Sequence, residues 1–279
     1  MAARVVLEGL AFPEGPRWRD GLLWFSDVEA GQVLAIDEGG ARHTVIEDLP
    51  GGPPSGLGWL PDGRLLVVAT AARTVLAVGP GGAVSTHADL SGLASYRCND
   101  MVVDAAGRAY VGSCDLRGMP HPADSELILV RPDGAASIAD PALRFPNGTV
   151  ITSDGTTLIV AETFGRRLTA YTIGAGGALS GRRVWADLPG AMPDGICLDR
   201  DNHVWYADPR ANACIRVAEG GEVTDRIDAD RAVFACTLGG EDGRTLFVLT
   251  SHFPPDGTAR TRPGQILAHR VAVPGTGSP

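Results

Sequence analysis

The chain has 279 residues, of which 44% are hydrophobic, and a formal net charge of −9. This acidic balance, with no block of Lys or Arg, argues against nucleic acid or an anionic membrane as a partner. No apolar run approaches the length of a membrane span, and the start, MAARVVLEGLAFPEGP, lacks the long apolar core of a signal peptide. We therefore expect a cytoplasmic protein that does not bind membranes.

The glycine, proline and cysteine contents indicate the fold class and the state of the thiols. The 37 Gly and 20 Pro residues favour many short strands over long helices. Five cysteines are scattered without CxxC spacing, which is typical of reduced, buried thiols. They are Cys98, Cys114, Cys197, Cys214 and Cys236.

A phrase of apolar run, turn and strand recurs six times, at intervals of about 45 residues. The turns fall at Asp20-Gly21, Asp62-Gly63, Ala106-Gly107, Asp154-Gly155, Asp201-Asn202 and Asp242-Gly243. Such a period is typical of a radially repeated β-fold in which each unit is one four-stranded blade. We predict an all-β, six-bladed β-propeller.

The strands can be followed in chain order within single repeats. The second repeat gives Gly56–Leu60, Leu65–Ala69, Val75–Val78 and Val84–Ala88. The fourth and fifth repeat this layout, with short β-rich runs bounded by Gly, Pro, Asn and Asp. The sixth has strands at Thr237–Leu238, Leu246–Thr250 and Ile266–Val271 but no clear fourth strand.

The strand Arg4–Leu7 precedes the first repeat and could supply that missing fourth strand. Closing the ring in this way would leave only short, protected edges. We therefore expect a single propeller domain over residues 1–272 and a flexible C-terminal tail over 273–279.

The residue about seven positions before each turn carries the functional signal. These positions hold Glu14, Ser55, Asn99, Asn147, Asp194 and Ala235, and equivalence by repeat would gather them around one axis. Pro-Asn-Gly and Pro-Asp-Gly are also common turn tripeptides, so Asn147 or Asp194 alone would suggest a turn. Four carboxylate or amide side chains in the same phase instead favour a shared site.

Glu14, Asn99, Asn147 and Asp194 offer two carboxylates and two amide carbonyls. Hard oxygen donors suit a divalent cation, Ca²⁺ above all, with Mg²⁺, Mn²⁺ and Zn²⁺ as alternatives. Four protein ligands leave coordination positions for water and substrate, as a catalytic ion requires. We predict one divalent metal ion on the axis.

Several motifs together resemble the SMP-30/gluconolactonase/luciferin-regenerating family over essentially the whole chain. They are Phe12-Pro13-Glu14-Gly15-Pro16-Arg17-Trp18, Arg97-Cys98-Asn99-Asp100, Phe145-Pro146-Asn147-Gly148 and Pro193-Asp194-Gly195. The resemblance implies a six-bladed propeller with a divalent ion in its tunnel, held by residues matching Glu14, Asn147 and Asp194. It also implies substrate binding by Arg97 and Asn99. The family's substrate-contacting Glu on a later loop has no counterpart here, where Cys114–Ser125 stands instead.

The expected function is hydrolysis of a lactone, a sugar lactone or related cyclic ester, with the metal polarising the carbonyl and Asp194 assisting the attack of water. The partner would be a small molecule. Two alternatives stay open: phosphotriester or other chemistry on the same scaffold, and a non-catalytic propeller that binds Ca²⁺. The sequence does not predict an oligomeric state.

Insertions at 114–125 and 251–264 follow the second strands of the third and sixth repeats. In an up-and-down blade, such loops overhang the mouth nearest the axial residues, which is where substrate selection usually occurs. His252 begins the second insertion, and its pKa range suits a proton carrier. We predict it as a further substrate-binding residue.

Overall fold

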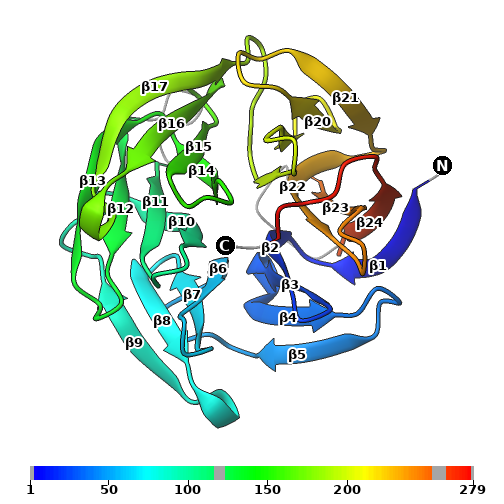
Figure 1. The fold of residues 1–279 in the computed structure, drawn as a ribbon. Coiled ribbons are helices and arrows are strands. Elements are labelled where there is room, and N and C mark those ends of the chain that lie inside the picture. The colour runs from blue at the N-terminus through cyan, green and yellow to red at the C-terminus, as the bar shows by residue number, and fades with distance from the viewer. Residues whose placement is uncertain (1–2, 116–122, 253–261, 278–279) are drawn as a thin grey trace.

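The computed structural model describes residues 3–115, 123–252 and 262–277. It contains six four-stranded antiparallel sheets arranged as the blades of a ring (Figure 1). The predicted six-bladed β-propeller is therefore confirmed. Apart from strands, the described chain has three single-turn 3-10 helices, at Val28–Ala30, Pro80–Gly82 and Ala175–Gly177.

Each blade uses four strands, and the first five blades take theirs in chain order. Blade 1 has β2 (Pro13–Arg19), β3 (Leu22–Asp27), β4 (Gln32–Ile36) and β5 (Arg42–Ile46). Blade 2 has β6 (Pro54–Trp59), β7 (Leu65–Ala69), β8 (Thr74–Val78) and β9 (Val84–Asp89). Blade 3 has β10 (Arg97–Val103), β11 (Ala109–Cys114), β12 (Ser125–Val130) and β13 (Ala136–Leu143).

The remaining blades complete the ring. Blade 4 has β14 (Pro146–Ile151), β15 (Thr157–Glu162), β16 (Arg167–Ile173) and β17 (Leu179–Asp187). Blade 5 has β18 (Ile196–Leu198), β19 (Val204–Asp208), β20 (Ala213–Val217) and β21 (Val223–Asp228). Blade 6 has β22 (Ala232–Gly239), β23 (Thr245–Ser251), β24 (Gly264–Arg270) and, from the other end of the chain, β1 (Arg4–Leu10).

The ring closes as predicted, because β1 pairs antiparallel with β24, from Arg4 opposite Ala268 to Leu10 opposite Gly264. This pairing joins the two ends of the chain in one sheet and hydrogen-bonds the inner edge of β1. The C-terminal residues that the structure describes form hydrogen bonds with blade 5. Gly275 forms a bridge with Asp199, and the Thr276 N–H donates to the Leu198 carbonyl, so residues 274–276 of the expected flexible tail lie against blade 5.

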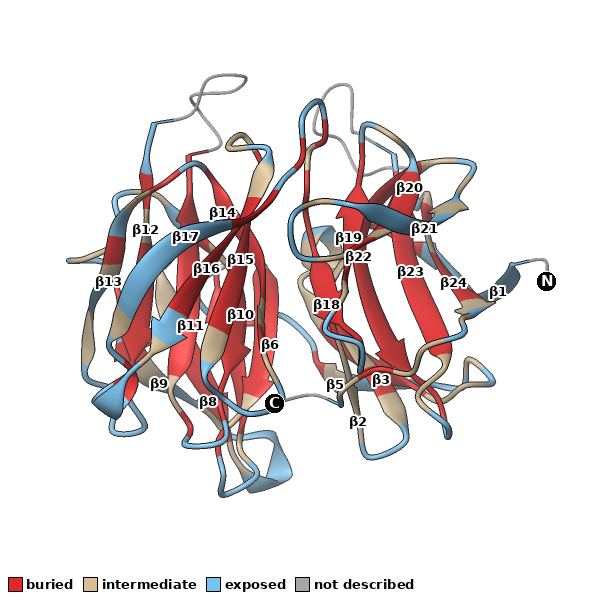
Figure 2. Cartoon of the chain, turned by 45° about the horizontal axis from the view of Figure 1, so that its top comes forward, coloured by how far each residue is buried: buried red, intermediate tan, exposed pale blue. Residues whose placement is uncertain are grey.

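The hydrophobic core is divided among the blade interfaces. In the described chain, six clusters of buried apolar side chains each join two neighbouring blades. Strands in the middle of the blades, such as β19 and β23, are wholly buried, whereas the outermost strands β17 and β21 are largely exposed (Figure 2). All five cysteines are buried free thiols. No helix in the described residues is long and apolar enough to cross a membrane.

The first strand of each blade lies nearest the axis (Figure 1), and glycines let these strands approach closely. A Cβ on Gly148 would lie 2.4 Å from the Ile196 nitrogen, and one on Gly195 would lie 2.8 Å from the Ala235 Cα. Across the same contact the Gly148 N–H donates to the Asp194 carbonyl at 3.2 Å. Any larger side chain at these positions must push two blades apart.

We predict that Gly148→Ala lowers the free energy of unfolding by about 1–3 kcal/mol, because the added methyl group meets backbone atoms that cannot move independently. Chemical denaturation measures this change. Gly92→Ala is the matched control, since a Cβ there meets no atom within 4 Å and the residue has no positive φ. Equal effects of the two substitutions would contradict the close packing described here.

Candidate active site

The residues predicted at the axis are brought together in the floor of one cavity of about 430 Å³. Its lining includes Glu14, Asn99, Asn147 and Asp194, together with Arg97 and Ser55. Each of the four oxygen-bearing side chains comes from a different blade. The phase of the repeat therefore does gather them around one axis.

Irregular pairing in the innermost strands aims these side chains at the axis. The β2–β3 register shifts between Glu14 and Arg17, and the β14–β15 register shifts between Pro146 and Thr149. The β10–β11 register shifts between Cys98 and Met101, on either side of Asn99. Such bulges are common beside active sites because they release a residue from the ladder and redirect its side chain. Asp194 lies just before β18, which begins at Ile196.

A chain of side-chain hydrogen bonds connects the floor across four blades. The Ser55 hydroxyl donates to Asn99 Oδ1 at 3.2 Å, and Asn99 Nδ2 donates to Asn147 Oδ1 at 3.0 Å. Asn147 Nδ2 then donates to the Thr163 hydroxyl at 3.2 Å, which donates to the Pro193 carbonyl at 2.8 Å. These bonds fix the positions of both amides before any ligand enters.

The two carboxylates of the floor, Glu14 and Asp194, are unfavourable in their charged forms, because they are buried close to other negative charges. Burial, then the charges of Asp194 and Asp100, raises the pKa of Glu14 well above its ordinary value, although the Gly15 N–H donates to Glu14 Oε2 at 2.7 Å. Burial, then the charge of Asp100, likewise raises the pKa of Asp194. A divalent cation would offset the repulsion between them. The donor set of two carboxylates and two amide oxygens fits such an ion.

Asp100 is a third buried carboxylate at the axis, and its role was not predicted from the sequence. It forms an ion pair with Arg17 at 3.3 Å, and Arg17 also donates to the Met101 carbonyl. Burial raises the pKa of Asp100, while Arg17 opposes that change. One signal was available: Asp100 follows the axial residue Asn99, where four other blades have Gly15, Gly56, Gly148 and Gly195.

Arg17 lines a second, smaller cavity. Val102, Cys197 and Leu238 line it too, and the C-terminal residues Gly275 and Thr276 form part of its wall. None of the four predicted ligands lines this smaller cavity. The larger cavity, with the four predicted ligands, is the candidate site.

The structure does not place His252 in the wall of the larger cavity, as far as the described residues define it. His252 is exposed. The pKa of Asp230 is lowered chiefly by a hydrogen bond from Arg231, with a smaller contribution from His252. Substrate binding by His252 stays a prediction. Most of the two insertions, at 116–122 and 253–261, lies outside the described residues.

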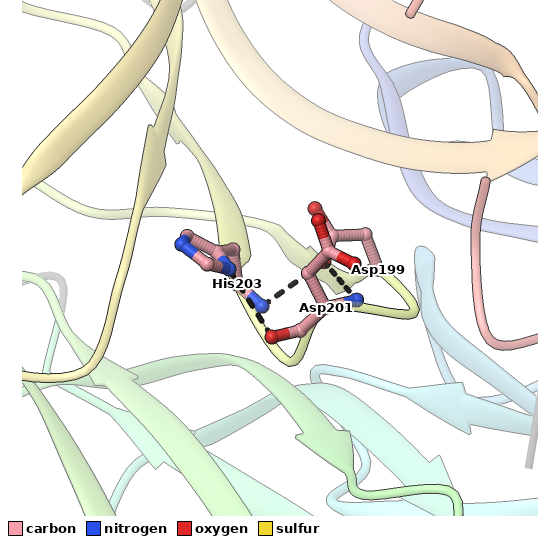
Figure 3. Close-up of side chains that lie close together, drawn as sticks. All are labelled: Asp199, Asp201 and His203. Carbon is pink, nitrogen blue, oxygen red and sulfur yellow. Dashed lines mark hydrogen bonds between the residues drawn. The ribbon is translucent and has the colours of Figure 1, made fainter. Parts of the chain in front are cut away.

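A second group of possible ligands lies at a turn of blade 5. Asp199, Asp201 and His203 place one ligand atom each within 4.8 Å of one another (Figure 3). Asp199 Oδ1, however, accepts the N–H groups of Asp201 and His203, and Asp199 Oδ2 accepts from Arg216 at 2.6 Å. Arg216 also pairs with Asp201 at 3.2 Å. The Arg216 guanidinium already neutralises these carboxylates, so the cluster stabilises the turn and is not assigned as a metal site.

A further ring of residues lies two positions before the axial ones, and of its members only Arg97 was predicted from the sequence. Phe12, Pro53, Arg97, Phe145 and Met192 all line the cavity. Four of them stand just before the innermost strand of their blade, where the chain enters it, and Arg97 is the first residue of β10. These residues could have been found in the sequence by counting two positions back from each axial residue. Arg97 belongs to this ring and is exposed at the mouth.

Comparison with known proteins agrees with this architecture. Residues 12–252 match the SMP-30/gluconolactonase/LRE-like region. A pentonolactonase of Haloferax volcanii is 28% identical over 92% of this chain and 87% of its own length. A diisopropyl-fluorophosphatase of Loligo vulgaris is 30% identical over 64% of this chain and 63% of its own length.

Among solved structures, a regucalcin from Agrobacterium tumefaciens superposes with a TM-score of 0.84 and 21% identity, covering 100% of this chain and 96% of that one. This likeness supports the fold. The family match spans most of the chain and includes every predicted ligand. The chain belongs to the SMP-30/gluconolactonase/LRE-like family.

Proposed function

We propose that the chain is a divalent-metal-dependent lactonase whose ion is held by Glu14, Asn99, Asn147 and Asp194. The observation that supports this most directly is the convergence of two carboxylates and two amides from four blades on one open cavity. Several relatives in the family are named as lactonases, among them the pentonolactonase and an L-arabinolactonase of Azospirillum brasilense.

Bound there, the ion would polarise the lactone carbonyl and stabilise the negative charge that develops on its oxygen. Hard oxygen donors favour Ca²⁺ and admit Mn²⁺, Mg²⁺ or Zn²⁺. A relative from Danio rerio is named regucalcin, and the solved structure from Agrobacterium tumefaciens is described as a calcium-binding protein. Ca²⁺ is thus the first ion to test.

Asp194 would accept a proton from the water molecule that adds to the carbonyl carbon. As the ring C–O bond breaks, that proton would pass to the leaving oxygen, so the product is an open-chain hydroxy acid. Arg97, at the mouth, would bind the oxygens of substrate or product through its fork of N–H donors. The amides of Asn99 and Asn147 are held by the hydrogen-bonded chain and need no rearrangement.

A second candidate is phosphotriesterase-type chemistry, hydrolysis of an organophosphorus compound, favoured by the 30% identity with the diisopropyl-fluorophosphatase. The same floor could polarise a P=O bond. Parallel assays with a lactone and with diisopropyl fluorophosphate, each with added Ca²⁺, separate the two. Tight Ca²⁺ binding without turnover of either would instead favour a non-catalytic propeller.

The raised carboxyl pKa values predict how pH affects the metal-free protein. The folded state keeps protons on Glu14 and Asp194 that the unfolded chain releases above about pH 4, so these groups lower stability as pH rises from there toward neutral. The double variant Glu14→Gln/Asp194→Asn removes this effect. Its free energy of unfolding should therefore exceed that of the wild type by an amount that grows with pH.

Added Ca²⁺ should raise the free energy of unfolding of the wild type and leave the double variant unchanged. Chemical denaturation between pH 4.5 and 7.5, with and without Ca²⁺, measures both effects. A pH-independent difference between the two proteins would contradict the raised pKa values of these two carboxylates.

Removing single ligands should abolish turnover through loss of the ion. We expect Asp194→Ala and Glu14→Gln each to lower kcat/KM by a factor of roughly 10³ or more and to reduce bound metal to background. Metal analysis of the purified variants, next to lactone assays, measures this. Activity retained by metal-free Asp194→Ala would rule out the mechanism.

Arg97→Ala tests substrate binding separately from metal binding. Loss of a charge-assisted contact should lower kcat/KM about 10- to 100-fold while bound metal stays at the wild-type level. Arg64→Ala is a control, since that Arg is exposed and paired with Asp62 away from the cavity. Loss of metal in Arg97→Ala would mean that Arg97 supports the ion instead.

A further inference from the structure

Four aromatic rings stand in the lining of the cavity that holds the oxygen donors. Phe12 and Phe234 contact each other with ring centroids 4.6 Å apart, and Phe145 and Phe164 do so at 5.3 Å. All four line the cavity. The first pair belongs to blades 1 and 6 and the second to blade 4, which stands opposite blade 1 in a six-bladed ring (Figure 1). Apolar surface therefore faces the axis from two sides.

The other described residues of the wall continue this apolar surface. Pro53 and Met192 fill the same layer in blades 2 and 5. The hydroxyls of Ser55 and Thr163 also reach the cavity, but each already donates a hydrogen bond inside the protein. The charged side chains of Arg97 and Glu29 are exposed, which places them at the mouth.

The aromatic wall is held rigidly by carboxylates behind it. Asp27 Oδ1 accepts the backbone N–H of Phe12 at 2.7 Å, and Glu162 Oε2 accepts that of Arg144 at 2.8 Å. The Thr163 N–H donates to the Phe145 carbonyl at 3.1 Å. Neither Asp27 nor Glu162 lines the cavity. The rings are thus positioned in advance, and binding need not order them.

We propose, on the basis of the lactonase function proposed above, that the preferred substrate is a lactone bearing an aromatic ring, with that ring held between the two phenylalanine pairs. A sugar lactone would bring several hydroxyl groups against this wall, and each hydroxyl that loses water without gaining a partner weakens binding. A phenyl substituent instead gains from burial and from edge-to-face contacts with the wall.

Three six-membered lactones with alkoxide leaving groups test the proposal: 5-phenyl-δ-valerolactone, δ-valerolactone and D-glucono-1,5-lactone. After division by each spontaneous hydrolysis rate, kcat/KM with Ca²⁺ should be at least tenfold higher for the phenyl compound than for δ-valerolactone. The sugar lactone should be the poorest of the three. A higher value for the sugar lactone overturns the proposal but leaves the lactonase function standing.

Phe164→Ala tests the wall itself. The ratio of kcat/KM for the phenyl compound to that for δ-valerolactone should fall about tenfold, whereas Val184→Ala, on exposed β17, should leave the ratio unchanged. Circular dichroism and thermal melting confirm that both variants fold. An unchanged ratio in folded Phe164→Ala contradicts the assignment of this ring to substrate binding.

Binding without turnover gives an independent readout. The lactam analogue 6-phenylpiperidin-2-one should bind the wild type about tenfold more tightly than Phe164→Ala in calorimetric titrations, and more tightly than unsubstituted piperidin-2-one. If none of the three lactones is hydrolysed with any divalent ion, the lactonase function fails. The lactam titrations would still decide whether the wall selects an aromatic ring, and equal affinities for the two lactams would refute it.

Discussion

The close approach of the innermost strands around the axis is the constraint on which the rest of this structure depends. In four of the six blades the residue directly after the axial position has no side chain; these residues are Gly15, Gly56, Gly148 and Gly195. A Cβ on any of them would come within 3 Å of an atom in the next blade. Because the strands are so near, the residue before each glycine has only the narrow axis to enter. Packing and the donor ring thus have a single cause.

That geometry concentrates negative charge, and the three carboxylates at the axis differ in their surroundings. Burial raises the pKa of all three, but Asp100 has a cationic partner in Arg17, at 3.3 Å, which opposes the change. Glu14 and Asp194 also experience the charge of Asp100, which raises their pKa values further. A buried charge without compensation costs stability, which a functional site can recover by binding a cation. The two carboxylates nearest the open cavity are therefore the ones left for an ion.

Features that repeat with the blades could be predicted from the sequence. Features that occur in one blade alone could not. Blade number, ring closure by the first strand and the grouping of Glu14 with Asp194 all follow from phase. Asp100 departs from the glycine pattern, and only the fold shows that Arg17 lies beside it. The prediction for His252 rests on its place at the start of an insertion, and position after a strand does not determine whether a side chain turns inward or outward.

The layered wall also separates chemistry from selectivity. Phe12, just before β2, and Glu14, on β2, both line the cavity, so one residue can shape the wall while the other provides a donor. The wall is fixed by bonds to its backbone, as in the contact of Asp27 with the Phe12 N–H, and these bonds do not depend on which side chain stands there. A propeller of this kind can therefore change its wall residues, and with them its substrate, while the floor and its ion stay the same.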